Sequence, residues 1–139
     1  MANEFARNIQ DAALNPAAFA LPAAASTSTN STGVDLGADT VKPESVELEL
    51  SVPALSTTIV PDTRTVDYII ETSTASNFAT IDQTILNERQ TGAGAAGVGA
   101  FLKRVRLPSN CARYVRAKIT FGASTTSGAA VSATFTLRF

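Results

Sequence analysis

The stretch Arg113–Phe139, RYVRAKITFGASTTSGAAVSATFTLRF, decides the fold class. From Tyr114 to Phe121 polar and apolar residues alternate, and the same alternation returns from Val131 to Phe139. A segment of Gly, Ala, Ser and Thr, residues 122–129, separates the two runs. Strict alternation with a period of two is the pattern of a half-buried β-strand. The end of the chain therefore predicts two strands separated by a turn.

The rest of the chain contains shorter runs of similar strand-like sequence. Pro, Gly, Ser and Thr clusters separate them, which is typical of an all-β sandwich or barrel. With 139 residues, 45% of them hydrophobic and 17% charged, we expect one compact core. Further strands are expected at 34–37, 46–52, 64–72 and 100–108, and the run 78–86 is open between a strand and an irregular segment.

The first 33 residues have a different composition. They are rich in Ala, Ser, Thr and Asn and are interrupted by Pro16 and Pro22, so a helix cannot extend much beyond residues 2–14. We therefore expect an extended N-terminal arm, residues 1–33, followed by a β-sandwich domain, residues 34–139. No run approaches about 18 uncharged apolar residues, which predicts a soluble protein without a membrane span.

Cysteine and histidine counts exclude several kinds of chemistry. With one Cys and no His, a Ser-His-Asp triad, a Cys-His pair and a His-ligated zinc site are impossible. We expect Cys111 to be a small buried residue at a turn rather than a reactive thiol. Gly92, Gly94 and Gly97 match a dinucleotide-binding pattern, but no acidic residue follows Glu88 to hold a ribose, so a surface loop is expected. The sequence predicts no catalytic residue, no cofactor, no metal and no enzyme activity.

Charge is divided unequally along the chain. Residues 1–88 hold twelve acidic and three basic residues, whereas residues 89–139 hold eight basic residues and no acidic one. Two interpretations stay open: a surface for nucleic acid or an acidic partner, or acidic and basic strands that neutralise each other within the fold. On strands the basic residues alternate onto shared faces, which predicts a cationic patch that meets carboxylates of a neighbour. The partner-binding residues expected there are Arg104, Arg106 and Arg116.

Several segments together resemble one known family. They are VDLGA (34–38), VDYIIETSTASNF (66–78), a Gly-rich loop, LPSNCARYVRAKITF (107–121) and a final ATFTLRF (133–139). In this order they resemble the capsid cement (decoration) proteins of tailed bacteriophages, of the kind found in a Bordetella phage. The resemblance covers most of the chain after residue 33, and residues 107–121 carry most of it.

The resemblance implies a jelly-roll-like antiparallel β-sandwich on the outer surface of a phage capsid. Its partner is the major capsid protein of the HK97-type fold, and its copies form a homo-oligomer, a trimer rather than a dimer, that bridges neighbouring capsomers. The family brings no cofactor, no membrane and no nucleic acid. The alternatives are a β-barrel that binds nucleic acid or polysaccharide, and a receptor-binding module. The large apolar residues expected to anchor the arm on a partner are Phe5, Ile9, Leu14, Phe19 and Leu21.

Overall fold

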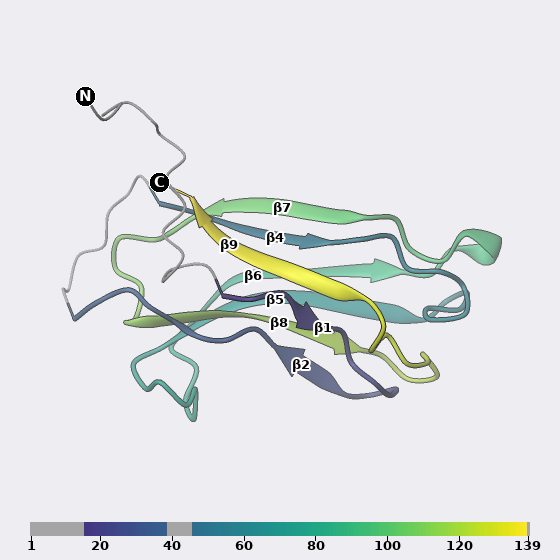
Figure 1. The fold of residues 1–139 in the computed structure, drawn as a ribbon, viewed down its shortest axis with the longest axis horizontal. Helices are drawn as coiled ribbons and strands as arrows, with labels where there is room; N and C mark the ends of the chain where they lie inside the picture. The colour runs from purple at the N-terminus through teal and green to yellow at the C-terminus, as the bar shows by residue number, and fades with distance from the viewer. Residues whose placement is uncertain (1–15, 39–45, 139) are drawn as a thin grey trace.

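The chain forms two antiparallel β-sheets packed face to face, which confirms the predicted all-β sandwich (Figure 1). The computed structural model describes residues 16–38 and 46–138. The first sheet has the order β1 (Phe19–Ala20), β9 (Ser132–Arg138), β4 (Glu47–Val52) and β7 (Phe101–Arg106). The second has the order β2 (Ser28–Asn30), β8 (Tyr114–Phe121), β5 (Thr65–Ser73) and β6 (Gln83–Thr91), and β3 (Val34–Asp35) also pairs with β8.

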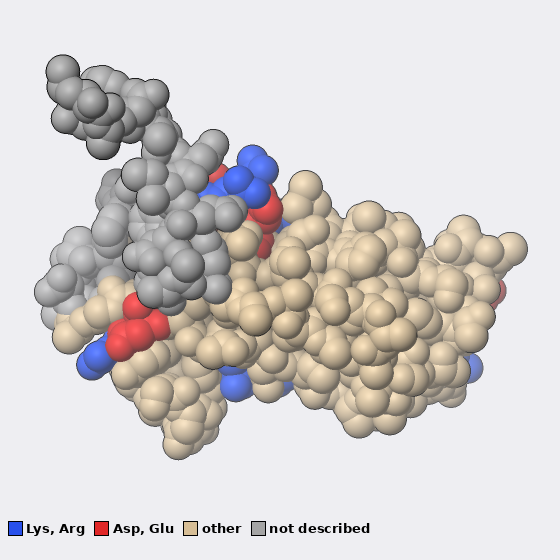
Figure 2. Space-filling view, in the orientation of Figure 1, with Lys and Arg blue, Asp and Glu red and all other residues tan. Residues whose placement is uncertain are grey.

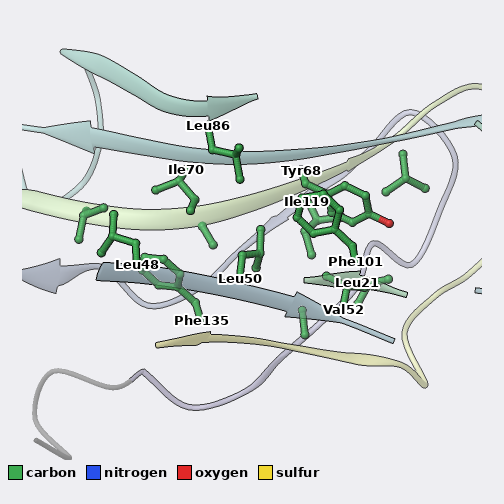
Figure 3. Close-up of a cluster of buried hydrophobic side chains, with 14 of the residues drawn as sticks. Leu21, Leu48, Leu50, Val52, Tyr68, Ile70, Leu86, Phe101, Ile119 and Phe135 are labelled. Atoms are coloured by element: carbon green, nitrogen blue, oxygen red, sulfur yellow. The ribbon is translucent and has the colours of Figure 1, made fainter. Parts of the chain in front are cut away.

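The core lies between the sheets and is built by the alternation in the sequence. In β8 the apolar residues from Val115 to Phe121 are at most 1% exposed, while the polar residues between them are half-buried. Figure 3 shows side chains of both sheets, among them Leu50 and Ile119, filling the space between the layers. Burying each such side chain stabilises the fold by about 1.5–3 kcal/mol relative to exposure. No described residue belongs to a helix long and apolar enough to cross a membrane.

One aromatic pair joins the two layers. The rings of Tyr68 on β5 and Phe101 on β7 are stacked, with centroids 4.0 Å apart. The Tyr68 hydroxyl donates a hydrogen bond to Gln90 Oε1 over 2.9 Å, which satisfies its polar atom inside the core. Burial raises the pKa of Tyr68, so this hydroxyl stays protonated over the whole physiological range.

The two C-terminal strands are present as predicted, but they belong to different sheets. β8 pairs with β5, β2 and β3, whereas β9 pairs with β4 and β1. The turn between them therefore carries the chain across the sandwich. Gly128 is required in this turn, because a Cβ there would lie 2.8 Å from the ring of Phe121 and 2.9 Å from Leu21.

The described part of the predicted arm, residues 16–33, is built into both sheets. Phe19 pairs with Ala133 of β9, and Ser28 pairs with Thr120 of β8. Between these strands Leu21 is 1% exposed and enters the core. β1 has two residues and β2 three, too few to show an alternation, so the sequence pattern does not reveal them. Residues 1–15 lie outside the described part of the chain.

The run 78–86, open between a strand and an irregular segment, divides at Gln83. Residues before it form a loop after β5, and β6 begins at Gln83. The pairing of β5 with β6 shifts register between Ile70 and Glu71, which marks a β-bulge near the start of β6. From Leu86 to Thr91 the pairing is regular.

Candidate interaction surfaces

The three arginines expected to form one cationic patch lie on opposite faces of the molecule. Arg104 and Arg106 share the outer face of β7, as the alternation predicted, but β7 belongs to the first sheet. Arg116 lies on the outer face of β8 in the second sheet. The prediction of a single patch is therefore wrong, because the loop between β7 and β8 crosses from one sheet to the other rather than joining neighbouring strands.

Acidic residues of the first half of the chain neutralise most of these cations. Every ion pair found in the described residues joins an acid before residue 89 to a base from residue 89 onward. This confirms the interpretation that acidic and basic strands pair within the fold, and it explains the unequal charge of the two halves. The six pairs are Asp67–Arg89, Glu88–Lys103, Glu49–Arg104, Asp35–Arg113, Glu71–Arg116 and Glu49–Arg138.

On the first sheet, Glu49 of β4 is held between two arginines from the neighbouring strands. Arg104 of β7 contacts Glu49 Oε2, and Arg138 Nη2 of β9 donates to Glu49 Oε1 over 2.8 Å. Glu49 is 7% exposed. Burial acts to raise the pKa of Glu49, but the hydrogen bonds and positive charges of Arg138 and Arg104 outweigh it and leave that pKa below its ordinary value. Glu49 is therefore ionised in the fold.

On the second sheet, Arg116 is enclosed by a carboxylate and an aromatic ring. Its Nη2 lies 2.5 Å from Glu71 Oε1, and its guanidinium carbon lies 4.3 Å from the centre of the Phe78 ring. The side chains of Arg116 and Glu71 are 17% and 5% exposed. Phe78 comes from the loop between β5 and β6 and is itself buried at a left-handed φ of 53°. This arginine therefore contributes to packing within its own chain.

Two basic residues of the second half, Arg106 and Lys118, have no ion-pair partner among the residues that the structure describes. Arg106 is exposed on the first sheet opposite Glu47, which also faces Arg138 in the register. Lys118 is half-buried on the second sheet, opposite Ile69. Because they lie on opposite faces, they do not combine into a cationic groove.

The residues expected to anchor the arm divide into two groups. Phe5, Ile9 and Leu14 lie outside the described residues, and their anchoring role stays a prediction. Phe19 is half-buried against the core of its own chain, and Leu21 is a core residue. In this fold the side chain of Leu21 is therefore enclosed by its own sandwich.

One end of the sandwich carries almost no charge, which is a feature that no single sequence segment reveals. Four loops meet there, at the right-hand end of Figure 1, and we call them the uncharged end. They are residues 22–27, 53–64, 92–100 and 122–131, and Asp62 and Arg64 are their only charged members. Most of the charged surface visible in Figure 2 lies toward the opposite end, and a small amount of acidic and basic surface shows at this end. The sequence signal is the small-residue composition of each loop, but only folding brings the loops together.

These loops are hydrogen-bonded to one another rather than independent. Asp62 Oδ1 accepts from Gly94 N over 2.9 Å, which ties the loop between β4 and β5 to the Gly-rich loop. Thr126 N donates to Ile59 O over 2.9 Å, and Leu55 forms a bridge with Val98. The end of the sandwich is thus a connected surface of small side chains.

The remaining candidate motifs form a turn and a surface loop. Cys111 is buried in a turn, as expected, and its own amide donates to Pro108 O. The glycines of the dinucleotide-like pattern form a surface loop, in which Gly94–Ala96 makes one turn of 3₁₀-helix. Within residues 16–38 and 46–138, no group of three or more His, Cys, Asp or Glu is placed to hold a metal. No protein-family model matches the chain, and no curated protein matches it in sequence.

Proposed function

We propose that this chain is a phage capsid cement (decoration) protein. It binds the outer surface of a shell built from a major capsid protein and bridges neighbouring capsomers, so that the head resists the outward pressure of packed DNA. The proposal begins with the resemblance of residues 107–121 and the segments around them to that family. An all-β sandwich with two outer sheet faces suits a protein that covers other protein surfaces.

The observation that carries the proposal is the internal pairing of cations. Six of the eight basic residues after residue 88 are paired within the chain, and the other two lie on opposite sheets. A nucleic-acid-binding β-barrel needs a continuous cationic groove and exposed aromatic side chains for stacking bases. The described surface offers neither in one place, which favours a protein surface as the partner.

The jelly-roll connection is part of the proposal, and the strand order supports it. Because β2 and β3 occupy successive parts of one edge of β8, they count as one interrupted strand. Each sheet then has four strands, and the chain crosses between the sheets after β1, β3, β4, β6, β7 and β8. Eight strands in two such sheets form the jelly roll of many viral capsid proteins. Since a fold does not determine a function, this likeness alone would not suffice.

The uncharged end is the surface that we propose for contact with the shell. Its Ala and Gly side chains lose almost no rotamer freedom when they are covered, so contact there costs little entropy. Residues 1–15, with Phe5, Ile9 and Leu14, would add a second contact. Several weak contacts on one oligomer raise its overall avidity by about 10² to 10⁴ when all of them engage together.

Co-sedimentation with empty phage heads that lack a decoration protein tests the proposal. We expect binding that saturates at a fixed ratio to the capsid protein, and treated heads that withstand higher temperature before they release their subunits. A chain shortened by residues 2–15 should bind more weakly, because β1 and Leu21 remain in place and only the proposed second contact is lost.

Failure to bind any head, together with a gel shift of single-stranded DNA or retention on a polysaccharide column at moderate salt, would refute the proposal in favour of the β-barrel alternative. Deletion of residues 2–25 is not a suitable test. It removes β1 and Leu21, so a loss of binding would report unfolding of the sandwich edge.

A further inference from the structure

The free edges of the two sheets differ greatly in length. β1 and β2 are edge strands of two and three residues, and β7 is an edge strand of six. β6 is an edge strand of nine residues, and within the described part of the chain it pairs with β5 alone. A long strand edge with unpaired peptide groups is a template for another strand, and short edges are poor ones.

Hydrogen bonds at the end of β5 show which peptide groups of β6 point away from the sheet. Gly92 N donates to Arg64 O over 2.7 Å, on the β6 side, and Gly122 N donates to Thr65 O over 2.8 Å, on the β8 side. Because direction alternates along a strand, every second residue of β6 counted back from Gly92 faces β5. The peptide groups that point outward are those of Asn87, Arg89 and Thr91.

The two long edge strands, β7 and β6, differ in the charges that they carry. β7 carries Arg106, which is exposed and has no ion-pair partner among the described residues, so pairing of β7 with a second β7 would bring uncompensated like charges together, which is destabilising. β6 carries one acid and one base, Glu88 and Arg89, and is regular from Leu86 onward. The bulge that would twist an edge away lies before this regular part.

We propose that two copies of the chain pair antiparallel through their β6 edges, with Glu88 at the two-fold axis. Asn87 of one copy then faces Arg89 of the other, and each such pair exchanges two main-chain hydrogen bonds. The second sheets of the two copies join into one continuous sheet. This contact gives a dimer, whereas the family resemblance favoured a trimer, and it refines the homo-oligomer of the proposed function without requiring the shell.

The charges at the axis complement one another in this register. Each Glu88 carries its own counter-ion, because Lys103 Nζ lies 2.5 Å from Glu88 Oε1. Each Glu88 carboxylate therefore reaches the axis together with the ammonium group of its own Lys103. Arg89 is likewise neutralised by Asp67, to which it donates over 2.6 and 2.9 Å. No uncompensated like charge is brought together.

A proline at an outward-pointing position tests the pairing with little effect on the monomer. The Asn87 amide is not used by β5, so Asn87→Pro removes a donor that only the second copy would accept, and edge strands tolerate proline at such positions. Sedimentation velocity of the full chain over a concentration series should show a dimer for the native protein and for Asn87→Ala. Asn87→Pro should weaken dimerisation at least about tenfold, because each dimer contains two copies of Asn87 and therefore loses two main-chain hydrogen bonds.

Amide exchange in the native protein gives a readout that does not depend on the variant. The Asn87 and Arg89 amides should exchange more slowly at high protein concentration than at low concentration, whereas the exposed amide of Ala95 should not change. A native chain that stays monomeric, an Asn87→Pro chain that dimerises normally, or exchange at Asn87 and Arg89 that is independent of concentration overturns the proposal. All these measurements are made without phage heads, so their failure leaves the cement proposal standing.

Discussion

Glu71 and Glu49 are both buried carboxylates beside arginine, one on the outer face of each sheet, but their surroundings differ. Glu71 meets one arginine, Arg116, and the ring of Phe78 covers that arginine. Glu49 meets two arginines, and no aromatic ring is stacked on either of them among the described residues. The side chain of Arg104 is 54% exposed, against 17% for Arg116. The same cross-strand pairing thus builds an enclosed cluster on one sheet and an open one on the other.

The difference in solvent exposure determines how much each cluster contributes to the stability of the fold. An enclosed charge depends on its single partner, because water cannot replace that partner. In an open cluster, water and the second arginine compensate for part of any loss. We expect the enclosed cluster to matter mainly for stability, and the open face to remain available for contacts.

The largest effect is expected for Arg116→Ala. This variant leaves Glu71 charged, buried and unpaired, and it also removes the packing of Phe78, so the free energy of unfolding should fall by about 3–5 kcal/mol. Urea denaturation measures the change. Lys118→Ala is the matched control, since Lys118 lies on the same strand and face and has no ion-pair partner among the described residues, and it should change stability by less than about 0.5 kcal/mol. Equal losses in the two variants would contradict the enclosed-cluster interpretation.

A smaller effect that depends on pH is expected for Glu49→Gln. At neutral pH the loss should be about 1–2 kcal/mol, because the exposed Arg104 is partly screened. The pKa of Glu49 is lower in the folded chain than in the unfolded one, so its contribution is complete above an ordinary carboxyl pKa of ~4.3. That contribution is lost as the pH falls through the folded-state pKa.

Thermal unfolding of the native chain and of Glu49→Gln across the acidic range measures this dependence. The difference in stability between them should shrink on acidification. Glu47→Gln, on the same strand and face, is the control for the substitution itself. A difference that stays constant down to the most acidic point would show that Glu49 does not titrate as its surroundings imply.

The smallest effect on stability is expected for Arg106→Ser, within about 0.5 kcal/mol, because Arg106 is exposed and has no ion-pair partner among the described residues. Its consequence should instead appear in attachment to phage heads. Arg106 ends β7, whereas the loop of the uncharged end precedes β7, so the charge of Arg106 lies outside the proposed contact and acts on the approach to the shell. Stopped-flow light scattering at low salt should show slower attachment for Arg106→Ser, and an unchanged rate would show that this charge does not steer attachment.

Much of the fold was predictable from local alternation. The runs 46–52, 64–72, 100–108 and 114–121 are strands because their side chains alternate between a core and an outer face. The acidic first half and basic second half also indicated pairing within the fold, and every ion pair in the described residues follows that division. Alternation did not reveal β1 and β2, because strands of two and three residues are too short to show a period of two.

The sequence by itself determined that its alternating runs are strands, which side of those strands is buried and that no histidine chemistry is possible, because these properties depend on residues two positions apart or on composition. Only the tertiary structure decided which sheet each strand joins. Because of this sheet membership, Arg104 and Arg116 lie on opposite faces and Leu21 is enclosed in the core of its own chain. It also brings four loops with little charge together at one end and leaves β6 at an edge. Sheet membership depends on pairing between segments far apart in the chain, and a local pattern carries no information about which distant partner it will meet.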